Sequence, residues 1–228
     1  MPQSPLSHEL FDFLEDLQAN NDRDWFAENK SRYEEVVREP VLELITQLAK
    51  PMARSAPMLK AVPKKVGGSL MRIYRDTRFS KDKTPYKTNV GISLRHDADG
   101  DIHAPGVYVH LATEDCFIGA GCWQPASPTL SAIRRSIDED PKSWLKARDN
   151  KAFRAKYELT GSSLKTAPRD YPKDHPMIED LRRKDFIGIA PVSRKDLIQG
   201  DACKLIMDHI KAGKSLMAFI CDSVGIPY

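Results

Sequence analysis

The sequence predicts an α+β protein with a central antiparallel sheet of about four to five strands, and with N-terminal and C-terminal helices packed on its apolar face. Apolar residues recur with helical spacing up to about residue 56 and again after residue 125, and they alternate with period two in between. The connections between the alternating segments are too short for crossover helices, which favours an antiparallel meander. The 228 residues, 41% of them hydrophobic, are enough to form one core, and we expect a single domain over 1–228.

The first part of the chain is typical of consecutive helices. Leu10, Leu14 and Leu17 follow helical spacing, and Asn20-Asn21-Asp22 supplies a break and an N-cap for the next helix. Pro40 starts or kinks a third helical segment, because proline fits the first turn of a helix but not its interior.

The middle of the chain changes from helical to strand periodicity. The predicted strands are Met71 to Tyr74, Asn89 to Leu94, Val107 to Leu111 and Phe117 to Trp123, with reversals at Asp97 to Gly100 and Glu114-Asp115 and a fifth, edge strand at Phe186 to Val192. Alternation gives this sheet one apolar face, formed by Met71, Ile73, Val90, Ile92, Leu94, Val107, Val109, Leu111, Ile118, Ala120 and Cys122. The opposite face collects Arg72, Tyr74, Asn89, Gly91, Ser93, Tyr108, His110, Gly119 and Gly121, bounded by Phe117 and Trp123. Its glycines either open space for a ligand or receive a second helical layer.

Helical spacing returns after Pro125. We expect helices through Leu130 to Ile137 and Phe153 to Leu159, a loop over Thr160 to Pro176 and a short helix at Met177 to Leu181. The last predicted helix covers Asp196 to Val224, with a break near Gly213.

The basic block from Arg72 to Lys87 is the most unusual segment. It has six cations against two carboxylates, a net +4 in a chain whose formal charge is +3. Its cations are Arg72, Arg75, Arg78, Lys81, Lys83 and Lys87, and Ser80, Thr84 and Thr88 add hydroxyl donors. Such a block is either a solvated loop whose bases pair with Asp76, Asp82 and acidic helices, or an anion site held in place by Phe79, Pro85 and Tyr86.

Among the histidines, His110 is the strongest candidate for a general acid or base, because imidazole titrates near neutral pH and Tyr108 shares its face of the sheet. The turn containing His96, Asp97, Asp99, Asp101 and His103 has metal-capable side chains. Its Asp-Ala-Asp-Gly-Asp sequence is equally good turn chemistry, so no metal site is predicted.

Several functional classes lack their sequence signals. The four cysteines form no C-x-x-C pair, and no P-loop, dinucleotide fingerprint, nucleophile elbow or H-E-x-x-H motif occurs, so we expect no cofactor. No apolar run approaches the length of a membrane span and no secretory leader is recognisable, so we expect a cytoplasmic protein without a membrane partner. Nothing in the sequence indicates an oligomeric state.

The basic block also carries a resemblance to a known family. Together with Arg23 to Lys30, Gly106 to Leu111 and Phe117 to Trp123, it resembles the uncharacterised domain-of-unknown-function family numbered 2461. The resemblance runs nearly end to end and includes Leu164 to Arg169 and Asp174 to Pro176, while Gly91 to Arg95 is less typical of the family's pattern. It implies a single-domain member, and it brings no reaction, cofactor or catalytic residue.

The leading functional hypothesis is that the protein binds a phosphorylated or other anionic small molecule. A stronger version of this hypothesis is that the protein is an enzyme that acts on that ligand. The proposed ligand-binding residues are Arg72, Tyr74, Arg75, Arg78, Ser80, Lys81, Lys83, Tyr86, Lys87, Tyr108 and Trp123, and the proposed catalytic bases are His110 and Asp76. The alternatives are a nucleic-acid-binding protein, which the small net charge disfavours, and a protein-interaction module using the same basic and aromatic loop.

Overall fold

A computed structural model describes residues 4–97 and 104–228 and confirms the α+β class. Its sheet is antiparallel and six-stranded, one strand more than the predicted upper number, in the order β1-β2-β3-β4-β6-β5. The strands are β1 (Leu59–Lys60), β2 (Asn89–His96), β3 (Gly106–Ala112), β4 (Cys116–Cys122), β5 (Glu158–Thr160) and β6 (Phe186–Pro191).

Helices precede and follow the central strands, as the periodicity predicts. They are α1 (His8–Ala19), α2 (Arg23–Glu28), α3 (Lys30–Tyr33), a π-helical segment η1 (Glu34–Arg38), α4 (Glu39–Ser55), α5 (Ser127–Glu139), α6 (Pro141–Arg148), α7 (Lys151–Arg154), α8 (Ile178–Leu181), α9 (Arg194–Gln199) and α10 (Ala202–Ser223). The Asp22 side chain caps α2 by accepting a hydrogen bond from the Trp25 backbone N–H at 2.9 Å, as expected from Asn20-Asn21-Asp22. Within the described ranges, no helix is both long and apolar enough to cross a bilayer.

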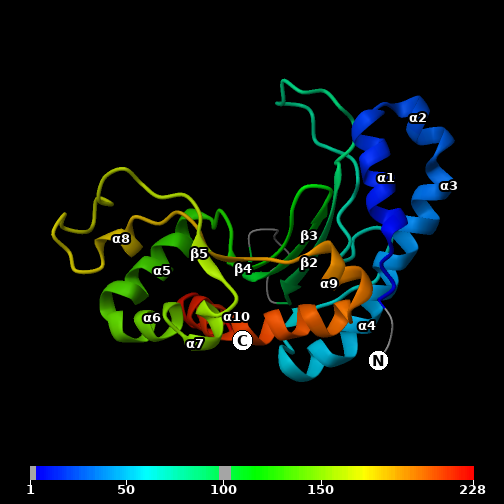
Figure 1. Ribbon diagram of the computed structural model, residues 1–228. Helices are drawn as coiled ribbons and strands as arrows, with labels where there is room; N and C mark the ends of the chain where they lie inside the picture. Colours follow the sequence, from blue (N-terminus) through cyan, green and yellow to red (C-terminus); the bar gives the residue numbers. More distant parts are fainter. Residues whose placement is uncertain (1–3, 98–103) are drawn as a thin grey trace.

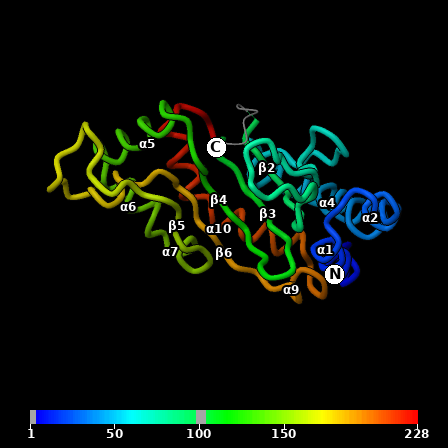
Figure 2. Tube along the Cα trace, turned by 90° about the horizontal axis from the view of Figure 1, so that it is seen from above, coloured from blue at the N-terminus to red at the C-terminus, as the bar shows by residue number. Residues whose placement is uncertain are grey.

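The helices cover one face of the sheet and both of its edges. Figures 1 and 2 show α10 running beneath the strands, with α1 to α4 on the side of β1 and β2 and α5 to α8 beside the β5 edge. Val90, Ile92, Val109 and Ile118 point from the strands into a buried apolar core that continues through α4 and α10. The core therefore lies on the face that the alternation predicts to be apolar.

The long C-terminal helix differs from the prediction of a break near Gly213, which is wrong. Helix α10 is continuous from Ala202 to Ser223. A Cβ at Gly213 would lie only 3.1 Å from the Cβ of Ala120, so the helix passes close to β4 at this glycine. The missing side chain serves close helix–sheet packing rather than a helix end.

Two predictions about the sheet edges are also wrong. Strand β6 is internal, because β5 pairs with it through Leu159 and Gly188. The helix expected over Phe153 to Leu159 ends at Arg154, and Phe153 and Tyr157 then cover Gly188 while Glu158–Thr160 pairs with β6. Short pairing of this kind depends on the neighbouring strand and leaves little signal in the local sequence.

The basic block forms a hairpin over residues 70–88, called the basic hairpin below, which projects beyond α1 in Figure 1. Met71 to Tyr74 is not a continuous strand; isolated bridges join Leu70 to Ile92 and Tyr74 to Tyr86. The hairpin is anchored on the N-terminal helices, because Tyr86 stacks on Phe26 at 4.1 Å and its N–H donates to the Asn21 side chain at 3.1 Å.

The predicted chain reversals have different outcomes. The antiparallel pairing of β3 with β4 confirms the reversal at Glu114-Asp115. The reversal at Asp97 to Gly100 lies outside the described residues from Ala98 onward.

Candidate functional site

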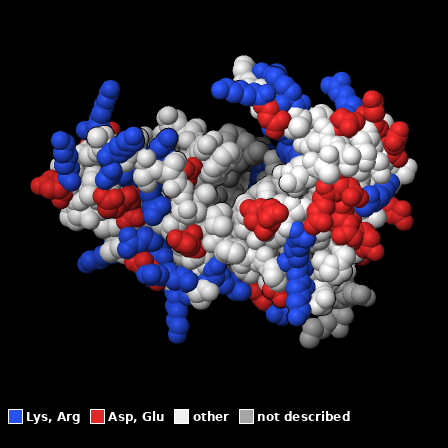
Figure 3. Space-filling view, turned by 45° about the horizontal axis from the view of Figure 1, so that its top comes forward, with Lys and Arg blue, Asp and Glu red and all other residues white. Residues whose placement is uncertain are grey.

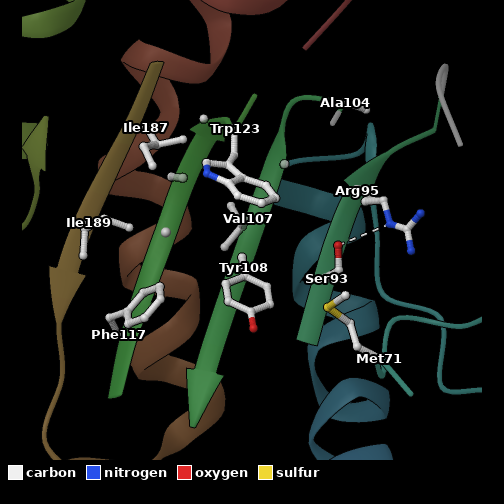
Figure 4. Close-up of a pocket in the computed structure, with 14 residues that line it drawn as sticks. Met71, Ser93, Arg95, Ala104, Val107, Tyr108, Phe117, Trp123, Ile187 and Ile189 are labelled. Atoms are coloured by element: carbon white, nitrogen blue, oxygen red, sulfur yellow. Dashed lines mark hydrogen bonds between the residues drawn. The ribbon is translucent and has the colours of Figure 1, made fainter. Parts of the chain in front are cut away.

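The uncovered face of the sheet contains a cavity of about 370 Å³, called the sheet hollow below. It is lined by Met71, Ser93, Arg95, Ala104, Gly106, Val107, Tyr108, Phe117, Gly119, Ala120, Gly121, Trp123, Ile187 and Ile189. Figure 4 shows Phe117, Tyr108, Ile189 and Trp123 standing around it, with Arg95 and Ser93 at one side. In the part of the chain that the structure describes, no second helical layer packs on this face, so its glycines do not receive one. That they open space for a ligand stays a prediction.

Glycines make the sheet hollow possible. Gly106 and Gly121 are directly paired across β3 and β4, and Gly119 lies opposite Tyr108 in the same ladder. Since none of the three has a side chain, the floor of the hollow is backbone. Gly91 has a different role, because a Cβ there would lie 2.7 Å from the Tyr108 hydroxyl oxygen, so the phenol lies directly over it.

Trp123 forms one wall of the hollow and is 50% exposed. The chain after it is fixed by Asp185, whose Oδ1 accepts the Gln124 N–H at 2.7 Å. The Asp185 Oδ2 accepts both the N–H and the hydroxyl of Ser162, at 2.8 Å and 2.5 Å. Burial opposes ionisation of Asp185, but these three hydrogen bonds outweigh it and lower the pKa of the carboxyl. A buried carboxylate therefore ties the Trp123 turn to the loop after β5.

A polar cluster borders the hollow beside Tyr108. The Tyr108 hydroxyl lies 3.2 Å from His110 Nδ1, and the Asn89 side-chain amide lies 3.5 Å and 3.4 Å from these two atoms. The His110 ring stacks on Phe117 with centroids 4.6 Å apart, and its Nε2 lies 3.8 Å from Asp115. Burial lowers the pKa of His110, while the Asp115 charge partly opposes that effect. His110 is thus placed as a neutral proton acceptor at neutral pH.

Three of the six cations of the basic hairpin are already engaged within it. Arg75 binds the Asp82 carboxylate and the Thr84 hydroxyl, Arg78 binds Asp76 at 2.7 Å, and Lys83 donates to the Thr77 carbonyl at 2.9 Å. Hydrogen bonds from Arg78 lower the pKa of Asp76 to about 2, so its carboxylate is a weak base at neutral pH. Hydrogen bonds from the Thr84 N–H and Arg75 likewise lower the pKa of Asp82 to about 2.

The remaining predicted residues of the basic hairpin lie away from the sheet hollow. Tyr74 and Tyr86 pack against each other at 5.4 Å toward Phe26, and Ser80 and Lys81 are near the hairpin tip. Met71, which the alternation places on the apolar face, instead lines the hollow. Met71 therefore points to the opposite face from the one predicted. This segment meets β2 only through the Leu70 bridge and the hydrogen bond from the Met71 N–H to the Gly91 carbonyl, so it does not follow the alternation of a regular strand.

A second, polar cavity of about 390 Å³, called the hairpin cavity below, lies between α1 and the base of the basic hairpin. It is lined by Gln18, Asn21, Arg75, Asp82, Thr84, Tyr86, Lys87, Thr88 and Asn89. Asn89 connects the two cavities, because it lines this one while its amide contacts Tyr108, which lines the sheet hollow. Among the described residues Lys87 forms no ion pair with a carboxylate, whereas the Arg72 charge acts on Asp76. Burial, and then the Arg72 charge, lower the pKa of Lys87.

The surface around the cavities is uneven in charge. Figure 3 shows a hollowed region of uncharged residues between two lobes, with Lys and Arg side chains of the basic hairpin raised beside it. Sequence reasoning missed Ile187 and Ile189, the apolar wall from β6, although their alternation within Phe186–Pro191 was a visible signal. It also missed Arg95, which donates from Nε to the Ser93 hydroxyl at 3.2 Å.

The described residues contain no group of three or more His, Cys, Asp or Glu side chains placed to hold a metal ion. Asp99, Asp101 and His103 lie outside those residues, so the absence of a metal site at this turn stays a prediction.

Comparison with known proteins identifies a family. A family model described as "Conserved hypothetical protein (DUF2461)" matches residues 9–219. No curated protein and no solved structure matches the chain.

Proposed function

The chain belongs to the family of conserved hypothetical proteins DUF2461, and from its two cavities we propose that it binds a small organic anion. The apolar body of the ligand occupies the sheet hollow, and its anionic group lies in the hairpin cavity at Lys87. Phosphorylated molecules and carboxylates both satisfy this description.

One observation carries the proposal: the contact between Asn89 and Tyr108 links the open apolar hollow to a cavity lined by Lys87, a half-buried lysine that forms no ion pair among the described residues. Small-molecule sites are typically apolar cavities with a few convergent polar groups, and both features are present here. A partly buried cation without a counter-charge is costly, so an anionic ligand gains more there than at an exposed lysine. Arg72 adds positive charge beside Lys87.

The polar cluster supports the stronger hypothesis of an enzyme. Asn89, Tyr108 and His110 lie between the cavities, where the middle of a bound ligand would be. A neutral His110 can accept a proton and the Tyr108 hydroxyl can donate one, which is the minimum for acid–base catalysis. Asp76, at the other end of the basic hairpin and paired with Arg78, has no part in this arrangement.

Filling the hollow tests the proposal. A Cβ at Gly119 would lie 3.4 Å from Ile189 Cδ1, an ordinary contact, so Gly119→Ala should fold and bind normally while Gly119→Val projects methyl groups into the hollow. We expect phenyl phosphate and benzoate to raise the melting temperature of the wild-type protein more than inorganic phosphate does. We expect Gly119→Val to weaken their binding, measured by calorimetry, by about tenfold or more.

The anion end has its own matched pair of variants. Lys87→Met should weaken the binding of both phenyl phosphate and benzoate. Lys81→Met, which removes an exposed lysine near the hairpin tip, should leave their binding unchanged. Equal stabilisation by inorganic phosphate and aromatic anions, together with unchanged binding in Gly119→Val, would show that the hollow takes no part.

A nucleic-acid contact is the second candidate, and the hairpin tip favours it. Phe79 is 96% exposed, with the Arg78 guanidinium 5.8 Å from its ring centre, an arrangement that suits base stacking beside a phosphate. A partner protein with an acidic surface would use the same residues. A gel-shift assay with single-stranded DNA at low salt, repeated on Phe79→Ser, separates this function from ligand binding in the cavities.

We also propose a cytoplasmic location. The four cysteines are free thiols, three of them buried, as is usual in a reducing compartment. Fluorescence imaging of the tagged chain would test this location.

A further inference from the structure

We propose that Lys87 is a reactive amine that forms an imine with a carbonyl group of the bound molecule. The ligand would then be an anionic aldehyde or ketone, such as an oxo acid. This inference rests on the proposed function, because it concerns the same hairpin cavity and specifies the class of its ligand.

The position of Lys87 carries the argument. Its side chain is half-buried and lines the hairpin cavity. The Asp82 carboxylate in the same cavity is held by Arg75 and Thr84, and no ion pair between Asp82 and Lys87 forms. The other titratable groups facing the cavity are Arg75 and the Tyr86 phenol, while α1 and the segment after it contribute only the uncharged Gln18 and Asn21. Lys87 is thus a partly enclosed amine that forms no ion pair among the described residues, because the Asp82 carboxylate in its cavity is held by Arg75 and Thr84. The Arg72 charge also acts on it.

Such surroundings favour the uncharged, nucleophilic form of the amine. Burial disfavours the ammonium ion, and the nearby Arg72 charge disfavours it further, so both effects lower the pKa of Lys87. Lys81 and Lys83 lie in the same hairpin but are exposed to water. These two lysines are internal controls for the reactivity of Lys87, because they belong to the same chain and meet the same solvent but are not enclosed in a cavity.

The chemistry needs only the amine and the carbonyl compound. The nitrogen lone pair forms the C–N bond while the carbonyl π electrons move to oxygen, and transfer of a proton from nitrogen to that oxygen gives a carbinolamine. The hydroxyl group then leaves as water, taking the second nitrogen proton, and a C=N bond remains. The Thr88 hydroxyl and Asn89 amide line the cavity and can hydrogen-bond the departing oxygen, while the Arg72 charge near Lys87 favours an anionic ligand.

Competitive labelling measures the proposed reactivity directly. Trace acetylation of the folded protein with acetic anhydride at pH 7, quantified for each lysine by mass spectrometry, should modify Lys87 at least about threefold faster than Lys81 or Lys83 despite its burial. Arg72→Gln should slow Lys87 acetylation selectively, because it removes a charge that favours the free amine. A Lys87 rate at or below that of the exposed lysines would overturn the proposal.

Imine formation itself is tested with glyoxylate followed by borohydride. The reduced adduct should appear on Lys87 in the wild-type protein, disappear in Lys87→Arg and persist in Lys81→Arg. An adduct distributed equally over the surface lysines would contradict a dedicated site. The two proposals can fail separately. If aromatic anions bind through the hollow but Lys87 does not react selectively, the proposed ligand binding stands and the proposed imine is contradicted. If Lys87 is trapped selectively but Gly119→Val binds the aromatic anions normally, the imine stands and the proposed role of the hollow is contradicted.

Discussion

Gly121→Ala is expected to lower the free energy of unfolding by about 3 kcal/mol or more. Gly121 has φ +133°, a conformation that L side chains rarely adopt, and a Cβ there would lie 2.0 Å from the Phe186 carbonyl oxygen and 3.0 Å from the Ile187 Cα. Because the obstructing atoms belong to the backbone of β6, no side-chain rotation can relieve the overlap. Urea denaturation followed by circular dichroism measures the loss.

Gly119→Ala is the matched control for this prediction. It adds the same methyl group to the same strand and face, but its nearest neighbour is the flexible end of Ile189 at 3.4 Å. We expect a change within about 1 kcal/mol. If the two variants were equally stable, β4 and β6 would not approach each other as closely as the structure has them.

Asp185→Asn is expected to lower the free energy of unfolding by about 2–3 kcal/mol at pH 7. The amide retains one acceptor oxygen, but it loses the charge and cannot accept from both Gln124 and Ser162. Asp12→Asn, on an exposed position of α1, should change the stability by less than about 0.5 kcal/mol. An equal effect of both substitutions would show that the Asp185 hydrogen bonds contribute nothing specific.

The same carboxylate predicts a dependence on pH. The folded-state pKa of Asp185 is lowered, so its contribution is fully present above the unfolded value of about 3.9 and is lost as the pH falls through the folded value. The stability difference between the wild-type protein and Asp185→Asn should therefore be constant near neutrality and shrink below about pH 4. Asp76 and Asp82 also have lowered pKa values, but they titrate alike in both proteins and cancel in the difference. A difference that grew in acid would contradict the assigned ionisation state.

The sheet shows what alternation along a chain can and cannot predict. Period two identifies β2, β3 and β4 and sorts Val109 from Tyr108, since each strand supplies its own pattern. It does not say that α4 and α10 both pack on one face, because that depends on contacts between distant segments. Whether Gly119 and Gly121 border a cavity or a helix layer was for this reason undecided in the sequence.

In the candidate site, too, the local sequence predicts some features, while others depend on contacts between distant segments. The sequence shows the excess positive charge of the basic hairpin, but the pairing of Arg75 with Asp82 and of Arg78 with Asp76 depends on how the hairpin folds. Only after those pairs are assigned does Lys87 stand out as a cation in a cavity. Ile187 and Ile189 show the normal strand pattern, yet their place in the site depends on β6 pairing with β4.

That pairing also fixes the order in which the site can form. β4 ends at Cys122 and β6 begins at Phe186, so the ladder that brings Ile189 opposite Gly119 closes a long loop containing α5 to α8. Contacts across so many residues form late, because the entropy of loop closure is lost before the pairing is gained. During synthesis, which proceeds from the N-terminus, the first four strands are complete while one wall of the hollow has still to be made. If the proposed binding is correct, we expect it to be acquired only once β6 has emerged, and a chain that stops before β6 should not bind the aromatic anions.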